Sequence, residues 1–218
     1  MTNLESRCRL VLITPDVADE KECARIVGDA LKGGDVASVI VPQYGLSDQQ
    51  FQKHCEALVP VIQAAGAAAI VAGDSRVAGR VKADGLHVIG SALEIADAVE
   101  KYAPKLIVGA GNVANRHTAL EVGEANPDYL FFGKIGGDIK PEAHPKYLDL
   151  GEWWAALVEI PCIILGGTDP ASALAVAETG AEFVALSQAV FGKGDGASLV
   201  VAEVNALLDQ KAPRFEDL

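Results

Sequence analysis

The sequence predicts an α/β protein built as a single-domain (β/α)8 barrel, the TIM-barrel fold. Eight short apolar segments alternate with eight segments of helical spacing along most of the chain. The apolar segments are continuous, as expected for parallel strands that are covered on both faces. A doubly wound open sheet is the competing architecture, and it carries an early Gly-rich turn that is absent after the first apolar segment. We therefore favour the barrel.

Residues that interrupt extended structure mark the ends of the predicted strands. Pro15 stops the first strand, Pro42 stops the second, and Gly73-Asp74 ends the third. The predicted strands are Arg9–Thr14, Val36–Val41, Ala67–Ala72, Gly85–Ile89, Lys105–Gly109, Tyr129–Gly133, Cys162–Leu165 and Phe183–Leu186.

Capping and stop signals define the predicted helices. Gly33-Gly34 ends the first helix, Ser47-Asp48 caps the second, and Pro170 stands at the start of the seventh. The predicted helices are Asp19–Lys32, 48–63, Arg76–Lys82, Ala92–Tyr102, Asn115–Glu124, Leu150–Leu157, Pro170–Thr179 and Ala197–Asp209. No linker-like stretch interrupts this order, so residues 1–218 are expected to form one domain, with a frayed tail over 211–218.

Composition and charge narrow the class of protein. Half of the 218 residues are hydrophobic, which supplies a sizeable core. The net charge of −12 argues against non-specific binding to nucleic acid or to an anionic membrane. No apolar run approaches the roughly 18 residues of a membrane-spanning helix, and the first ten residues lack the apolar region of a signal peptide. The four separated cysteines suit reduced thiols. We expect a cytoplasmic protein, with a homodimer left open.

The stretch Ile160–Gly192 carries the clearest functional signal. It contains two apolar strands, and each ends in a turn of small residues, Gly166-Gly167 and Ser187-Gln188. In parallel α/β proteins, backbone N–H groups of such turns face anions, and barrels favour the ends of strands seven and eight for this purpose. The sequence therefore predicts a phosphate-binding site here.

Three segments in order resemble the thiamine phosphate synthase/TenI family of barrels. They are AAIVAGDSRVAGRVKADGLHVIGS, PDYLFFGKI and IPCIILGGTDPASALAVAETGAEFVALSQAV, and the resemblance covers most of the chain. The family synthase joins an aminopyrimidine pyrophosphate to a thiazole phosphate and expels pyrophosphate with magnesium. The resemblance implies that Gly166, Gly167 and Ser187 hold the thiazole phosphate. It also implies that Asp74 holds Mg²⁺ and takes part in catalysis.

Cationic side chains near the predicted strand ends are further candidates. Arg76, two residues after Asp74, is a candidate phosphate-binding cation. Lys134 directly follows the sixth strand, and Lys140 lies in the long polar loop after it, where it matches the lysine of the family's Thr-x-Thr-Lys segment. We assign a catalytic role to Lys140 and substrate binding to Lys134. His87, inside the fourth strand, is expected to be a buried core or near-site histidine.

The chain also departs from the family pattern. The Gln-x-Arg-x-Lys run of the second strand is replaced by SVIVPQYG, and Gly73 replaces the Asn before Asp74. Where the family has its second metal carboxylate after the fourth strand, IGSALE places Ser91 and then Glu94, and Gly111-Asn112 replaces a serine. Each lost electrostatic donor typically costs on the order of 10²–10³ in rate. The prediction is thus a thiamine phosphate synthase-like protein with weakened catalytic motifs.

Two alternatives remain open. A TenI-like thiazole tautomerase needs a base and a phosphate site but no pyrophosphate site, yet the histidine expected near the eighth strand is missing from VALSQAVFG. A non-catalytic barrel that binds a phosphorylated ligand is the other alternative. In all three cases, the expected ligand is a phosphorylated heterocycle.

Overall fold

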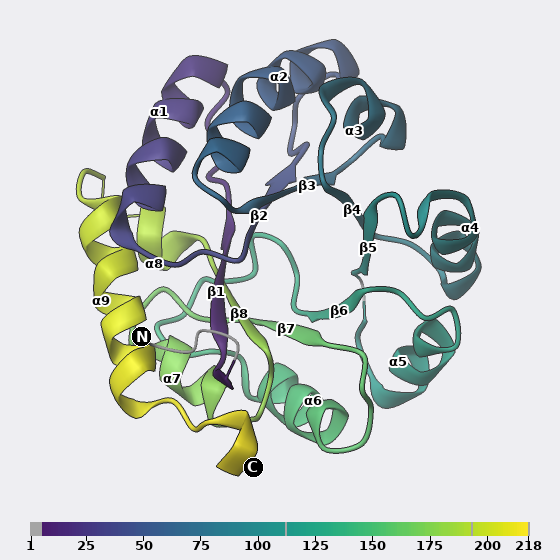
Figure 1. Ribbon diagram of the computed structural model, residues 1–218, viewed down its shortest axis with the longest axis vertical. Coiled ribbons are helices and arrows are strands. Elements are labelled where there is room, and N and C mark those ends of the chain that lie inside the picture. Colours follow the sequence, from purple (N-terminus) through teal and green to yellow (C-terminus); the bar gives the residue numbers. More distant parts are fainter. Residues whose placement is uncertain (1–5, 112, 193, 218) are drawn as a thin grey trace.

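The computed structural model describes residues 6–111, 113–192 and 194–217. Eight parallel strands close into one barrel in the order β1 to β8, and the helices surround it (Figure 1). The predicted (β/α)8 barrel is confirmed. The strands are β1 Arg9–Ile13, β2 Ser38–Pro42, β3 Ala68–Ala72, β4 Gly85–Val88, β5 Ile107–Ala110, β6 Tyr129–Phe132, β7 Cys162–Leu165 and β8 Phe183–Leu186.

The helices follow the strands as expected, and the two main differences concern α6 and α8. Helix α6 begins at Pro145, five residues before the predicted start at Leu150, because His144 caps it and Pro145 occupies its first turn. A four-residue helix, α8, directly follows β8 and was not predicted. The helices are α1 Glu20–Ala30, η2 Leu31–Gly33, α2 Asp48–Ala64, α3 Ser75–Val81, α4 Ala92–Tyr102, α5 Arg116–Gly123, α6 Pro145–Ala155, α7 Ser172–Ala177, α8 Gln188–Phe191, α9 Ala197–Lys211 and η3 Phe215–Asp217.

The tail after α9 continues in an ordered path through its described residues. Ala212 is buried, and a guanidinium nitrogen of Arg214 donates to the carbonyl oxygen of Asp209 at 3.0 Å. The 3₁₀ helix η3 follows. Within the described part of the chain, no helix has both the length and the apolar character of a membrane span.

Two layers of apolar side chains hold the barrel together. The larger layer lies between the strands and the surrounding helices, and includes Leu10, Leu12 and Trp154. The smaller layer fills the barrel interior, where Tyr129 and Phe131 of β6 are the largest members. Because each strand contributes alternate residues to the two layers, every strand is covered on both faces, as its continuous apolar sequence predicts.

Acidic residues directly before three even-numbered strands fix the register at the amino ends. The carboxylate of Asp84 accepts from the backbone N–H of Ala69 in β3 at 2.7 Å, and its own N–H donates to the carbonyl of Ala69. Asp128 makes the same pair of bonds to Val108 in β5. Glu182 accepts from the N–H of Cys162 in β7 at 2.9 Å. Each odd strand is thus tied to the even strand that follows it.

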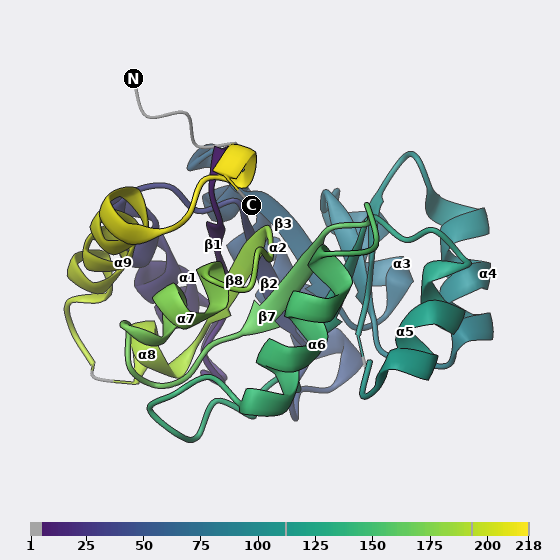
Figure 2. The same cartoon turned by 90° about the horizontal axis from the view of Figure 1, so that it is seen from below.

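The carboxyl ends of the strands meet at the opposite end of the barrel from both termini (Figure 2). Helix α8 and the loop between β6 and α6 lie at this carboxyl end. In barrel enzymes the active site lies at this end, so a functional site is expected here.

The interior packing leads to a stability prediction. A Cβ at Gly109 would overlap the ring of Tyr129. Gly109→Ala is therefore expected to lower the free energy of unfolding by about 1–3 kcal/mol through overpacking. Gly79→Ala, in α3 with open space around the new methyl group, should be neutral or stabilising by up to about 1 kcal/mol. Urea unfolding of both variants tests this, and equal stabilities would contradict it.

Candidate active site

The turn after β7 brings Gly166 and Gly167 to the carboxyl end of the barrel, where both are buried. The N–H of Gly166 continues the strand pairing and donates to Ala185 at 2.9 Å. The N–H of Gly167 donates to the hydroxyl oxygen of Ser172 at 2.9 Å. A Cβ at Gly167 would collide with the carbonyl group of Pro141. Glycine is required here because another segment of backbone lies directly on the turn.

That segment is the β6–α6 loop, residues 133–144. Its Lys140 carbonyl accepts from the N–H of Thr168 at 2.8 Å, and its Pro141 carbonyl accepts from the N–H of Asp169 at 3.1 Å. The loop therefore covers the β7 turn, residues 166–169.

The same loop reaches the turn after β8. The carboxylate of Asp138 accepts from the N–H of Gln188, the first residue of α8, through Oδ2 at 2.7 Å. Asp138 is only 3% exposed, and its other oxygen, Oδ1, has no hydrogen-bond partner among the described residues. Burial raises the pKa of this carboxyl group above its ordinary value. Ser187, the residue before Gln188, is also buried.

One cavity opens beside the β7 turn, and a neighbouring cavity lies toward the ends of β4 and β6. One, of about 470 Å³, is lined by Asp138, Lys140 and Gly166 among others. The other, of about 300 Å³, is lined by His87 and Lys134 among others. Tyr147 of α6 borders both cavities. The structure thus brings Gly166, Lys140 and Lys134 to one region, as the sequence predicts for a site at the strand ends.

His87 stands at the centre of this end of the barrel. It is 3% exposed, and its Nδ1 lies 3.0 Å from the hydroxyl oxygen of Tyr129. Burial raises the pKa of the Tyr129 phenol, so the hydroxyl keeps its proton. Burial also lowers the pKa of His87 to about 4. The imidazole is therefore neutral at pH 7, and its tautomer decides which of the two groups donates in this hydrogen bond.

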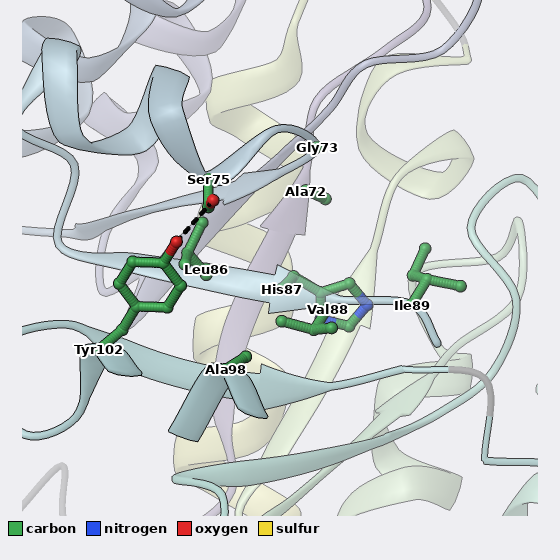
Figure 3. Close-up of a pocket in the computed structure, with 9 residues that line it drawn as sticks. All are labelled: Ala72, Gly73, Ser75, Leu86, His87, Val88, Ile89, Ala98 and Tyr102. Carbon is green, nitrogen blue, oxygen red and sulfur yellow. Dashed lines mark hydrogen bonds between the residues drawn. The ribbon is translucent and has the colours of Figure 1, made fainter. Parts of the chain in front are cut away.

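His87 also borders a third cavity, of about 340 Å³, toward α3 and α4. Figure 3 shows His87 and Ile89 along one edge of it, and the Tyr102 hydroxyl directed at Ser75 on the other. That hydroxyl donates to Ser75 at 2.7 Å.

Asp74 and Arg76 lie near this third cavity and interact with each other. Asp74 caps α3 by accepting from the N–H of Arg76, and the two side chains form a salt bridge with a shortest distance of 2.6 Å. Both carboxylate oxygens of Asp74 accept from the guanidinium group. Neither side chain lines the cavities that contain Lys134 and Lys140.

The magnesium prediction for Asp74 stays a prediction. Among the described residues, no group of three or more His, Cys, Asp or Glu side chains is close enough to hold a metal ion together. Mg²⁺ binds through one or two carboxylates and substrate phosphates, and Asp74 offers one carboxylate that is already paired with Arg76. The donor set does not fit a metal site made by the protein alone, and we derive no step through the ion. Asn112 of the family comparison lies outside the described residues.

Three residues of this region were not predicted as functional. Tyr129 and Tyr147 looked like ordinary apolar residues of a strand and a helix. Asp138 follows two glycines in a loop whose lysines are the predicted functional residues. An acidic residue in a loop that also carries Lys134 and Lys140 was the available signal.

Fold and site together define a (β/α)8 barrel with two neighbouring cavities at the carboxyl end of its strands, one of them beside the β7 turn. The family model described as thiamine monophosphate synthase matches residues 10–190. This chain belongs to that family, as the sequence resemblance predicts.

Individual relatives agree with the assignment. The thiamine-phosphate synthase of Rhodospirillum centenum is 32% identical over 205 residues, covering 92% of this chain and 98% of the relative. That of Hyphomonas neptunium is 31% identical over 212 residues, covering 94% and 96%. The solved thiamine phosphate pyrophosphorylase of Pyrococcus furiosus superposes with a TM-score of 0.79 at 24% identity, over 97% of this chain and 100% of that one. The last comparison supports the fold.

The lowered pKa of His87 predicts acid sensitivity. Because the unfolded value is near 6.5 and the folded value is about 4, the unfolded state binds more protons between these pH values. Stability present above pH 6.5 is therefore lost as the pH falls toward 4, by about 3 kcal/mol for this group. The difference in unfolding free energy between the wild type and His87→Gln, measured across this range, should reveal the effect. A pH-independent difference would contradict it.

Proposed function

We propose that this chain is a transferase of thiamine phosphate synthesis. It would transfer an aminopyrimidine methyl group from its pyrophosphate ester to a thiazole phosphate. In this reaction the thiazole nitrogen forms a bond to the methylene carbon, and the carbon–oxygen bond to pyrophosphate breaks. The pyrophosphate leaves with the bonding electron pair.

The observation that carries the proposal is the pair of adjoining cavities at the carboxyl end. Their volumes, about 470 and 300 Å³, fall within or near the range of small-molecule sites. Two heterocycles can lie side by side there, with Tyr147 bordering both. Such placement supplies the proximity that a two-substrate reaction needs. Relatives named thiamine-phosphate synthase that match over more than 90% of this chain support the same reaction.

The side chains around the cavities suit these substrates. Lys134 and Lys140 are exposed cations at the cavity walls, and each can neutralise part of the charge of a leaving pyrophosphate. Nε2 of the neutral His87 imidazole can form a hydrogen bond with a heterocycle, as donor or acceptor according to its tautomer, while Tyr129 holds the ring through Nδ1. Gly166, Gly167, Ser187 and Gln188 supply the predicted thiazole phosphate subsite. In the proposed complex, Asp74 could bind magnesium and Arg76 could bind pyrophosphate only after the salt bridge between them opens.

The proposed setting follows from composition. We place the reaction in the cytoplasm, with phosphorylated small molecules as ligands and no nucleic-acid partner, given the net charge of −12. A homodimer is the proposed assembly.

Direct assay tests the reaction. Purified protein mixed with the aminopyrimidine pyrophosphate, the thiazole phosphate and Mg²⁺ is expected to form thiamine phosphate, detected by mass spectrometry. Lys134→Ala and Lys140→Ala are each expected to lower kcat/KM by on the order of 10²–10³. Lys53→Ala, on the exposed side of α2, serves as the control and should leave kcat/KM unchanged.

The alternatives give different outcomes in the same experiment. A tautomerase would isomerise the thiazole carboxylate phosphate without consuming the aminopyrimidine pyrophosphate. A non-catalytic barrel would bind the thiazole phosphate in calorimetry and turn over neither substrate. Either result rules out the transferase.

A further inference from the structure

We propose that Asp138 and the loop that carries it occupy the phosphate subsite of this protein, and that a substrate phosphate must displace them to bind. This inference rests on the proposed function for the identity of the substrate, but its test uses inorganic phosphate alone. The part of the chain concerned is the β6–α6 loop, which lies at the same end of the barrel as α8 (Figure 2).

The first argument is that the backbone donors of the subsite are already used. In the β7 turn, the N–H of Gly167 donates to the hydroxyl oxygen of Ser172. The N–H groups of Thr168, Asp169 and Gln188 donate to the β6–α6 loop, at 2.8, 3.1 and 2.7 Å. An anion cannot receive these bonds while the loop stays in place.

The second argument is the nature of the acceptors. The loop supplies three oxygens within four residues, from the carbonyls of Lys140 and Pro141 and the carboxylate of Asp138. One of them is charged, and a carboxylate accepting from backbone N–H groups makes the stronger kind of hydrogen bond. A phosphate group likewise offers several oxygens and negative charge. The loop therefore presents to these turns the same type of acceptors as the ligand.

The third argument is space. The carbonyl of Pro141 and the backbone of Glu142 lie where a Cβ of Gly167 would be. A phosphate group is larger than a methyl group, so it cannot fit against Gly167 until the loop has moved. Binding of phosphate and the observed position of the loop are mutually exclusive.

The fourth argument is the unsatisfied second oxygen of Asp138. The residue is 3% exposed, and Oδ1 has no partner among the described residues. Burying an acceptor without a hydrogen bond costs free energy. The buried position of Asp138 therefore carries an unfavourable free energy, and displacing Asp138 costs correspondingly less free energy. Displacement also removes a negative charge that would repel the ligand.

Displacement would move the lysines of the loop together with Asp138. Lys140 lies two residues after Asp138, and its own carbonyl is one of the bonds that must break. A phosphate that displaces the loop therefore also frees Lys140, the side chain that is proposed to bind it. Phosphate binding and the arrival of Lys140 would be coupled through one loop.

Calorimetric titration with inorganic phosphate tests the competition. Asp138→Ala is expected to lower the Kd for phosphate roughly tenfold, since it removes a charge-assisted competitor. Asp138→Asn, which keeps the shape and loses the charge, should give a smaller decrease. Glu203→Gln is the control. This variant changes the net charge by the same amount at an exposed position of α9, and its Kd should match that of the wild type within about twofold.

Hydrogen exchange of the wild-type protein gives a second readout. Added phosphate should accelerate exchange over residues 137–143 and slow it over 167–169 and 187–188. Circular dichroism establishes that each variant is folded, and Asp138→Asn keeps the test available if Asp138→Ala does not fold.

The outcomes separate this inference from the proposed function. An unchanged or weaker affinity in folded Asp138 variants overturns the inference, as does the absence of phosphate binding in every variant. Tightened binding in the variants, in a protein that forms no thiamine phosphate, supports the inference and removes the proposed function.

Discussion

The contact between Tyr129 and Gly109 determines the shape of the interior on which the site depends. The ring of Tyr129 fills the space that any side chain at position 109 would need, and its hydroxyl then meets Nδ1 of His87. His87 stacks on the Tyr129 ring and meets Phe131 edge-on. One glycine on β5 thereby sets both the packing of the barrel and the orientation of a neutral imidazole toward its mouth.

The other side of the mouth is organised by backbone rather than by side chains. The turns after β7 and β8 present N–H groups, and the β6–α6 loop covers them with oxygens of its own. The two sides differ in what holds them: His87 packs against two aromatic rings, whereas the loop is bonded to the β7 and β8 turns through a few hydrogen bonds. In the proposed complex, His87 contacts the heterocycle, and the anion takes the place of the β6–α6 loop.

The sequence predicts the barrel well because each strand is a continuous apolar run, and most of these runs end at Pro or Gly, which is a local pattern. Helix α8 escaped prediction since four residues are too few to show a helical period. The strand-end rule predicts Gly166, Lys134 and Lys140 at the carboxyl end of the barrel, and in the structure they line two neighbouring cavities. The bond between Asp138 and Gln188 joins residues 50 positions apart, and that between His87 and Tyr129 spans 42. Neither leaves a trace in local spacing, because only the closed barrel brings the partners together.

The acidic residues before β4, β6 and β8 divide part of the barrel into strand pairs. Asp84, Asp128 and Glu182 each bond the strand before their own, so three successive strand pairs contain their own register contacts. These pairs are repeating modules within the barrel. A circular permutation that opens the chain between β4 and β5, or between β6 and β7, leaves every such contact inside an unbroken segment. An opening within a pair separates a carboxylate from its partner along the chain.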